Sequence, residues 1–193
     1  MVETLSKFGV PINGTRTGQY MPKIRHRFRV RVINFGPIAG GLELTQQVVN
    51  VNRPNVQFEQ GTLHSYNSIM YYAGKASWQT ISLEVRDDIT NSVSRLVGHQ
   101  LQKQMNFFEQ TSAAAGINYK FTTIIEIMDG GNEAVFEQWT LEGCFLEQVD
   151  YQQLDYSSSD AVTVQMTIRY DNATLADGLM TLNPEFRPGV TIA

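Results

Sequence analysis

The chain of 193 residues is 42% hydrophobic and 18% charged, with 15 Lys and Arg against 19 Asp and Glu and a formal net charge of −4. This is the composition of a globular domain long enough to bury a core. Its single cysteine, Cys144, excludes an intrachain disulfide framework and a multi-cysteine zinc or iron–sulfur site. No apolar run approaches the roughly 18 residues that span a bilayer, and the N-terminus lacks a signal-peptide pattern, so we expect a cytosolic protein where it is made.

Charge is distributed unevenly along the chain. Residues 1–31 carry seven bases and one acid, a net of +6, whereas residues 32–193 carry eight bases and eighteen acids, a net of −10. Such polarity suits nucleic-acid contact through the basic end, or docking of the basic end of one copy on the acidic body of another. Both alternatives stay open at this point.

The N-terminal region divides into an arm and a strand. Residues 1–24 are interrupted by Gly and Pro and predict an extended arm. From Arg25 the sequence alternates between basic and apolar residues, which predicts a strand with one polar face. The basic face of this strand comprises Arg25, Arg27, Arg29 and Arg31.

Alternating hydrophobicity predicts further strands, and one segment predicts a helix. The strands are expected over about residues 44–52, 78–86, 119–128, 134–146 and 161–171. Apolar residues recur at helical spacing over about 90–112, and Asp87 and Asp88 before them supply N-cap chemistry. Residues 56–73, rich in Tyr, Ser and Asn, predict an extended β-ribbon or a partly ordered loop.

These elements predict a mainly β chain in which strands flank a single helix. The expected fold class is an antiparallel β-sandwich or small barrel with one packed α-helix and an extended β-ribbon. We expect an extended arm at 1–24, a β domain at 25–172 and a C-terminal tail at 173–193.

No motif in the sequence predicts catalysis. The glycine-rich turn at 36–41 lacks the Lys-Ser/Thr of a phosphate-binding loop. The three histidines lie in separate elements, and helix capping explains the adjacent acids Asp87 and Asp88. Cys144 has no basic neighbour to lower its pKa and is predicted to be a buried or half-buried residue. We predict no catalytic residue, no cofactor and no metal site.

Two stretches, taken with the strand at 25–35, carry a family resemblance. The first runs from Tyr71 through Gly74-Lys75-Ala76-Ser77-Trp78 to Asp88, and the second runs from Gln138 through Trp139-Thr140-Leu141-Glu142-Gly143 to Asp171. Over about residues 25–172 the chain resembles the tail tube proteins of contractile-tailed bacteriophages. That family is similar to the tube proteins of type VI secretion and of phage-like contractile injection systems.

The resemblance implies an assembly. It implies hexameric rings that stack into a hollow tube, with strands of neighbouring subunits joined into a shared β-barrel around the lumen. The implied partners are further copies of the chain, a sheath protein outside, a tape-measure protein and double-stranded DNA in the lumen, and baseplate and tail-terminator proteins at the ends. The implied location is the virion, as a tail tube assembled in the host bacterial cytoplasm.

Two alternatives remain beside this one. The first is a baseplate tube initiator or a secretion-type tube ring, which would form rings from the same kind of β domain. A nucleic-acid-binding β-protein that uses the strand from Arg25 to Arg31 would belong to a different class.

The tube hypothesis assigns roles to particular residues. Candidate inter-subunit contacts are Arg25, Arg27, Arg29, Arg31, Tyr71 and Tyr72. Candidate lumen-facing residues, each opposite the apolar face of its strand, are Glu84, Glu126, Glu142, Thr163 and Gln165. Acidic lumen groups would repel phosphates, and the arginines are expected to meet acids of an adjacent copy. We expect residues 1–24 and 56–73 to become ordered mainly through contacts with neighbouring copies.

Overall fold

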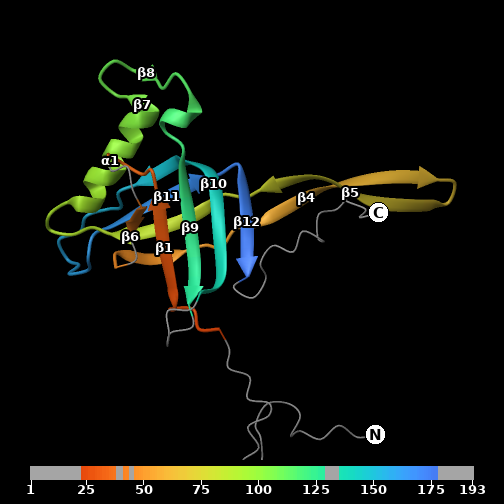
Figure 1. The fold of residues 1–193 in the computed structure, drawn as a ribbon, viewed down its shortest axis with the longest axis horizontal. Helices are drawn as coiled ribbons and strands as arrows, with labels where there is room; N and C mark the ends of the chain where they lie inside the picture. Colours follow the sequence, from red (N-terminus) through yellow and green to blue (C-terminus); the bar gives the residue numbers. More distant parts are fainter. Residues whose placement is uncertain (1–22, 38–40, 44–45, 129–134, 178–193) are drawn as a thin grey trace, which may run out of the picture.

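The computed structural model describes residues 23–37, 41–43, 46–128 and 135–177. They form an antiparallel β body with one packed helix and a long projecting hairpin (Figure 1). The body strands are β1 (Phe28–Ile33), β2 (Gly41–Glu43), β3 (Val48–Val51), β6 (Ile81–Arg86), β9 (Phe121–Met128), β10 (Val135–Asp150), β11 (Thr163–Arg169) and β12 (Asn172–Asp177). Their order is β2-β1-β9-β10-β11-β6-β3, with β12 also paired to β10. Within the described residues no barrel closes, and the predicted fold class is confirmed.

Strand β10 belongs to both halves of the sheet. Its first half pairs with β9 and β12, and its second half pairs with β11. The ladder to β9 shifts register between Leu141 and Cys144, and Gly143 between them has a φ of 69°. A residue with left-handed backbone conformation inside a strand bends the strand, and glycine adopts this conformation at little cost. The bend at Gly143 therefore turns one strand from the first sheet into the second.

The bend gives a stability prediction. A Cβ added at Gly143 would overlap Oδ2 of Asp171 and would hold a positive φ, so we expect Gly143→Ala to lower the free energy of unfolding by about 1–3 kcal/mol. Gly98 in the helix is the matched control, because a Cβ there meets nothing within 4 Å. Gly98→Ala is expected to raise the free energy of unfolding by about 0.5–1 kcal/mol. Urea unfolding measures both, and equal effects would contradict the role given to the bend.

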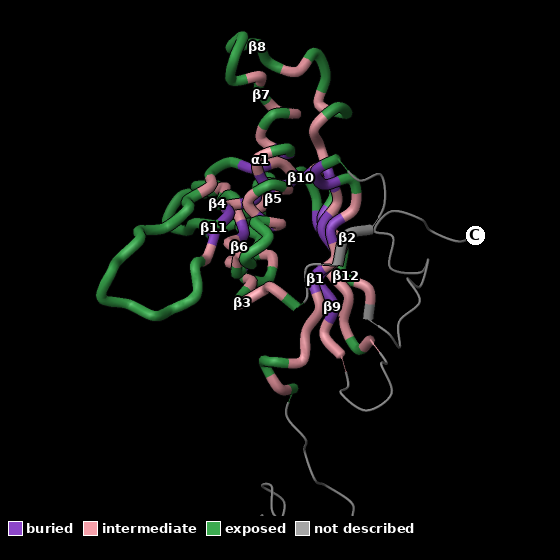
Figure 2. The backbone as a smooth tube through the Cα atoms, turned by 90° about the vertical axis from the view of Figure 1, so that its left-hand side faces the viewer, coloured by how far each residue is buried: buried purple, intermediate pink, exposed green. Residues whose placement is uncertain are grey.

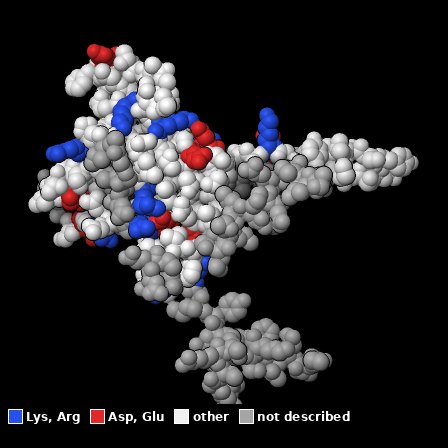
Figure 3. Space-filling view, viewed as in Figure 1, with Lys and Arg blue, Asp and Glu red and all other residues white. Residues whose placement is uncertain are grey.

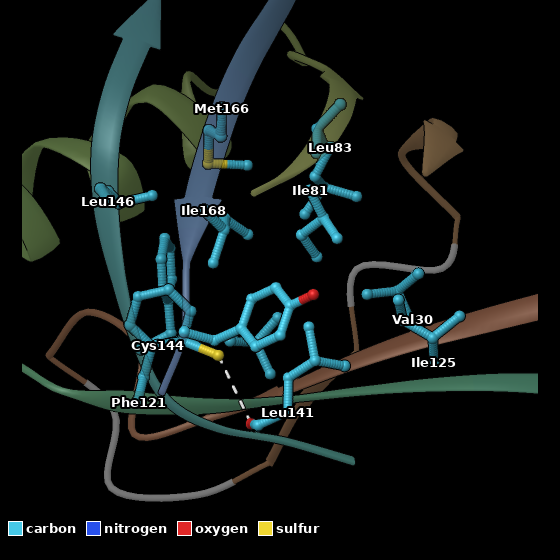
Figure 4. Packing of buried hydrophobic residues seen from close by; sticks show 14 of the residues in the cluster. Val30, Ile81, Leu83, Phe121, Ile125, Leu141, Cys144, Leu146, Met166 and Ile168 are labelled. Carbon is cyan, nitrogen blue, oxygen red and sulfur yellow. Dashed lines mark hydrogen bonds between the residues drawn. The ribbon is translucent and has the colours of Figure 1, made fainter. Parts of the chain in front are cut away.

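The core lies between the two halves of the sheet. Buried residues concentrate in β1, β9 and β10 on one side and in β6 and β11 on the other (Figure 2). Its members include Val30, Ile81, Leu83, Phe121, Ile125, Leu141, Leu146, Met166 and Ile168 (Figure 4). Cys144 is buried among them, as predicted, and burial raises the pKa of its thiol to about 11. The thiol is therefore neutral at physiological pH and unsuited to nucleophilic chemistry.

The α-helix begins where the sequence predicts. In α1 (Ser92–Gln104), the N–H of Ser92 donates to Asp88 Oδ1 at 3.0 Å and the N–H of Val93 donates to Asp87 Oδ1 at 3.2 Å. The hydrogen bond from Ser92 and a second from the Thr90 hydroxyl hold the pKa of Asp88 below its ordinary value. The predicted capping role of both aspartates is confirmed. No helix of the described residues is long and apolar enough to cross a membrane.

The predicted helix end near residue 112 is wrong. The helix ends at Gln104, and β7 (Met105–Asn106) pairs with β8 (Thr111–Ser112) in a small hairpin, followed by a short 3₁₀ turn at Gly116–Asn118. The side chain of Asn106 accepts the N–H of Phe108 at 3.0 Å. This local bond offers the backbone a turn in place of a further helical turn.

The predicted C-terminal tail also begins too early. Asn172–Asp177 form β12, which pairs with β10 from Glu137 to Glu142. Ala173 is buried, and Leu175 lies opposite Trp139 across the ladder. The domain therefore extends past residue 172 because β12 covers the open edge of β10. The rest of the predicted tail, and the predicted arm up to residue 22, lie outside the described residues.

Candidate functional site

The most exposed element is the projecting hairpin of β4 (Val56–Ser65) and β5 (Ser68–Trp78). It pairs only with itself among the described strands and extends away from the body (Figure 1). The predicted ribbon at 56–73 corresponds to it, although the second strand runs on to Trp78. From Val56 to Trp78 every residue except Gly61 and Trp78 is exposed, on both faces.

The hairpin is apolar and nearly uncharged. Its only Lys, Arg, Asp or Glu residues are Glu59 and Lys75, and most of its surface carries no charge (Figure 3). Its exposed large hydrophobic residues are Val56, Phe58, Leu63, Tyr66, Ile69, Met70, Tyr71 and Tyr72. A two-stranded hairpin with both faces in water is marginally stable, and an apolar surface of this kind marks a contact site.

The predicted contact residues Tyr71 and Tyr72 lie on this hairpin. Their side chains are 61% and 53% exposed, and because they are adjacent in a strand they point to opposite faces. Tyr72 lies opposite Gly61, and its ring occupies the space that a Cβ at Gly61 would fill. Tyr71 lies opposite Thr62. Each face of the hairpin thus exposes one of these two tyrosines.

The basic strand and one predicted lumen residue meet within the same chain. Arg29 lies directly opposite Glu126 across the β1–β9 ladder, and its Nε donates to Glu126 Oε2 at 2.7 Å. Arg31 Nη2 donates to the other carboxylate oxygen. The side chains of Arg29 and Arg31 are 30% and 34% exposed, whereas that of Glu126 is 2% exposed. The expectation that the Glu126 carboxylate lies on an open face is therefore corrected, because two arginines cover it.

Arg25 and Arg27 lie before β1 rather than in it, which shortens the predicted basic strand. The N–H of Arg27 donates to the carbonyl of Ile24 at 3.3 Å, so a turn precedes the first residue of β1. This turn borders a cleft of about 710 Å³ between residues 23–28, the β3 end at residues 49–53, and Ile125 and Ile127 of β9. We call this space the basic cleft. Its cationic side chains are those of Lys23, Arg25, Arg27 and Arg53.

One carboxylate lies beside the basic cleft. Glu137 Oε2 is 2.8 Å from Lys23 Nζ, and Glu137 Oε1 is 3.7 Å from Arg53 Nη1 and accepts the indole N–H of Trp139 at 2.7 Å. Burial raises the pKa of Glu137, but the bonds from Lys23 and Trp139 and the charges of Lys23 and Arg53 outweigh it, so the pKa lies below its ordinary value. The glutamate is therefore ionised, and its charge is shared between Lys23 and Arg53.

Three of the five predicted lumen residues share one face. Gln165 of β11 lies opposite Glu84 of β6, and Thr163 follows on the same side of β11. Glu84 accepts a hydrogen bond from Asn50, and Gln165 donates to Ser82 Oγ at 3.1 Å. Two predicted residues lie elsewhere. Glu142 is exposed on β10 beside the bend, and Glu126 is buried on β9.

Sequence comparison and structure comparison give different results. No family model matches the chain, and no curated protein is significantly similar to it in sequence. Solved structures do match. A chain of the six-fold symmetrised anti-feeding prophage baseplate has a TM-score of 0.65 at 14% identity, covering 84% of this chain and 100% of that one.

Two further structures show the same similarity. A chain of the anti-feeding prophage tube-terminating cap has a TM-score of 0.63 at 13% identity, with coverage of 87% and 99%. A chain of the PVC sheath–tube complex, an extracellular contractile injection system, has a TM-score of 0.59 at 13% identity, with coverage of 81% and 92%. Identity this low shows the fold alone. At the level of the fold, the predicted resemblance is confirmed: this chain shares its fold with chains of contractile injection systems.

Proposed function

We propose that the chain is a non-enzymatic structural subunit of the inner tube of a contractile phage tail, assembling as stacked hexameric rings around a channel. The observation that carries the proposal is the β4–β5 hairpin on a domain of this fold. Its apolar side chains are exposed in the part of the chain that the structure describes, so they are suited to burial against other copies. The similar baseplate chain belongs to a six-fold symmetrised assembly, which supports the hexamer.

The open sheet supports a barrel that is completed between copies. Among the described strands, the sheet path ends at β2 on one side and at β3 on the other. Unpaired strand edges are sites for pairing with another chain, and closure into a barrel removes them. We propose that copies in a ring join through such edges. The face that carries Glu84, Thr163 and Gln165 would then line the lumen together with Glu142.

The finer roles follow from this assignment. The tube would conduct double-stranded DNA and hold a tape-measure protein during assembly in the bacterial cytoplasm. A sheath protein would surround it in the virion, and baseplate and tail-terminator proteins would bind its ends. A specialised end ring or an injection-device tube is the second candidate, because two of the similar chains come from a baseplate and a cap.

The nucleic-acid-binding alternative is weakened by the ion pairs. Two of its four proposed phosphate contacts, Arg29 and Arg31, are bonded to the buried Glu126 of their own chain. The charge available to a phosphate on this strand is reduced accordingly.

Electron microscopy of the purified full chain tests the proposal. Negative staining over a concentration series is expected to show six-fold rings and, at higher concentration, tubes of constant diameter. Single rings that never stack would favour the end-ring candidate. Monomers that persist at high concentration in sedimentation velocity would overturn the tube assignment.

A further inference from the structure

The basic cleft has the character of a site that holds an acidic and apolar segment. Arg25 and His26 are exposed there, and among the described residues Arg25 forms no ion pair. Glu137 lies beside both Lys23 and Arg53, so its single charge is shared between two cations. Apart from the cationic residues, His26, Asn50 and Asn52, the lining is apolar and consists of Ile24, Phe28, Val49, Val51, Ile125 and Ile127. The volume of the cleft, about 710 Å³, is within the range of pockets that bind small molecules.

A segment with the complementary character lies between β10 and β11. We call residues 151–162 the acidic loop, and every one of them is exposed. The loop follows Asp150 directly and contains Asp155 and Asp160. The sequence has no Lys or Arg between Lys120 and Arg169. Its large apolar residues are Tyr151, Leu154, Tyr156 and Val162, of which Leu154 is 77% exposed.

The acidic loop is shaped by its own aspartates. Asp155 Oδ1 accepts the N–H and the hydroxyl of Ser157, each at 2.9 Å, and Asp160 Oδ2 accepts the hydroxyl of Ser158 at 2.8 Å. The bonds from Ser157 hold the pKa of Asp155 below its ordinary value, so this carboxylate is charged at neutral pH. The loop therefore presents fixed negative charge next to uncovered apolar side chains.

The acidic loop and the basic cleft lie at opposite ends of the same strands. At one end of β6, the N–H of Asp87 donates to the carbonyl of Val162 at 2.9 Å, which places the loop there. At the other end, the N–H of Asn52 donates to the carbonyl of Ser82 at 3.0 Å, beside the cleft. No residue of the acidic loop is among those that line the basic cleft in the described chain. Copies placed head to tail along these strands would bring the loop of one to the cleft of the next.

We infer that the basic cleft is the docking site for the acidic loop of a second copy of this chain. The inference rests on the proposed function as a self-assembling subunit and names one of its contacts. Opposite charge on the two surfaces would orient the copies, and the apolar side chains of both would be removed from water on contact. Because the two surfaces differ, the contact is heterologous and can repeat from copy to copy.

Charge reversal on each surface tests the contact. The cleft variant carries Arg25→Glu and Arg53→Glu, and the loop variant carries Asp155→Lys and Asp160→Lys. Each alone is expected to raise the concentration needed for assembly roughly tenfold to a hundredfold, because like charges then face each other. Combining all four substitutions in one chain is expected to restore assembly to within about tenfold of the parent, because the charges are exchanged rather than lost. Sedimentation velocity and negative staining measure assembly, and circular dichroism checks the fold.

Controls separate this contact from charge in general. Arg95→Glu on the exposed helix face and Glu109→Lys beyond the helix change charge at exposed sites outside both surfaces, and they are expected to leave assembly unchanged. If the parent assembles and the cleft and loop variants assemble equally well, the inference is overturned while the proposed function stands. If the parent stays monomeric, both are overturned. A cleft variant that assembles normally but loses binding of a fluorescent DNA duplex would assign the cleft to nucleic acid instead.

Discussion

Replacing the apolar side chains near the hairpin tip is expected to weaken assembly strongly and to leave the protomer folded. The triple variant Ile69→Thr, Met70→Gln and Tyr71→Thr removes side chains that are 51%, 59% and 61% exposed and that the domain does not use for its core. Full burial of such a side chain contributes about 1.5–3 kcal/mol. Losing three of them is expected to raise the concentration needed for assembly by at least about a hundredfold. Sedimentation velocity measures that concentration.

A control on the same hairpin separates apolar burial from charge. Glu59→Gln and Lys75→Gln remove its two charged groups and keep its apolar surface, so assembly is expected to persist. The urea midpoint of both variants is expected to match that of the parent. Tubes formed by the triple variant at the parent's concentration would contradict a contact role for the hairpin, and so for Tyr71.

The second large effect concerns the stability of the protomer. Arg29→Met with Arg31→Met would leave the Glu126 carboxylate buried without either ion-pair partner. Breaking a buried pair in this way costs about 3–5 kcal/mol, and we expect about 2–4 kcal/mol here because the arginines are partly exposed and water can reach the site. Urea unfolding followed by circular dichroism measures the loss.

Two further variants make this measurement specific. Glu126→Gln removes the buried charge together with the pair, so a smaller loss of about 1–2 kcal/mol is expected. Lys23→Met breaks an ion pair whose lysine is 58% exposed, and its effect is expected to stay within about 1 kcal/mol. A double arginine variant as stable as the parent would show that Glu126 does not need these partners.

The strands could be predicted because their alternation is local. Alternation predicts that every second residue of β1 and β6 lies in the core. The structure buries each of these residues, which are Val30, Val32, Ile81, Leu83 and Val85. The signal for the start of the helix is equally local, because the two aspartates that cap it lie just before it in the sequence. The signal for its end is not, because apolar residues continue at helical spacing while the side chain of Asn106 bonds the backbone into a turn.

The candidate sites depend on contacts that alternation does not encode. The alternation of side chains along the strand predicts Glu126 on its polar face. The pairing of β1 with β9 places two arginines over this glutamate. The basic cleft joins segments around Lys23, Arg53 and Ile125 that are far apart in the sequence. Gln100 is a similar case, since a polar residue of the helix is buried where it accepts the N–H of Gly36 and donates to the carbonyl of Tyr119.

The bent strand β10 makes the protomer mechanically continuous. Tension applied to the hairpin would enter along the backbone at its two ends, next to β3 and β6, and would pass through the ladders from β6 to β11, β10 and β9. Since β10 is shared, one sheet cannot slide past the other without breaking ladder hydrogen bonds or straightening the strand at Gly143. The rate of forced unfolding is set by the unfolding barrier. In the proposed stack, load on one sheet of a subunit would therefore pass to its other sheet through the backbone of β10.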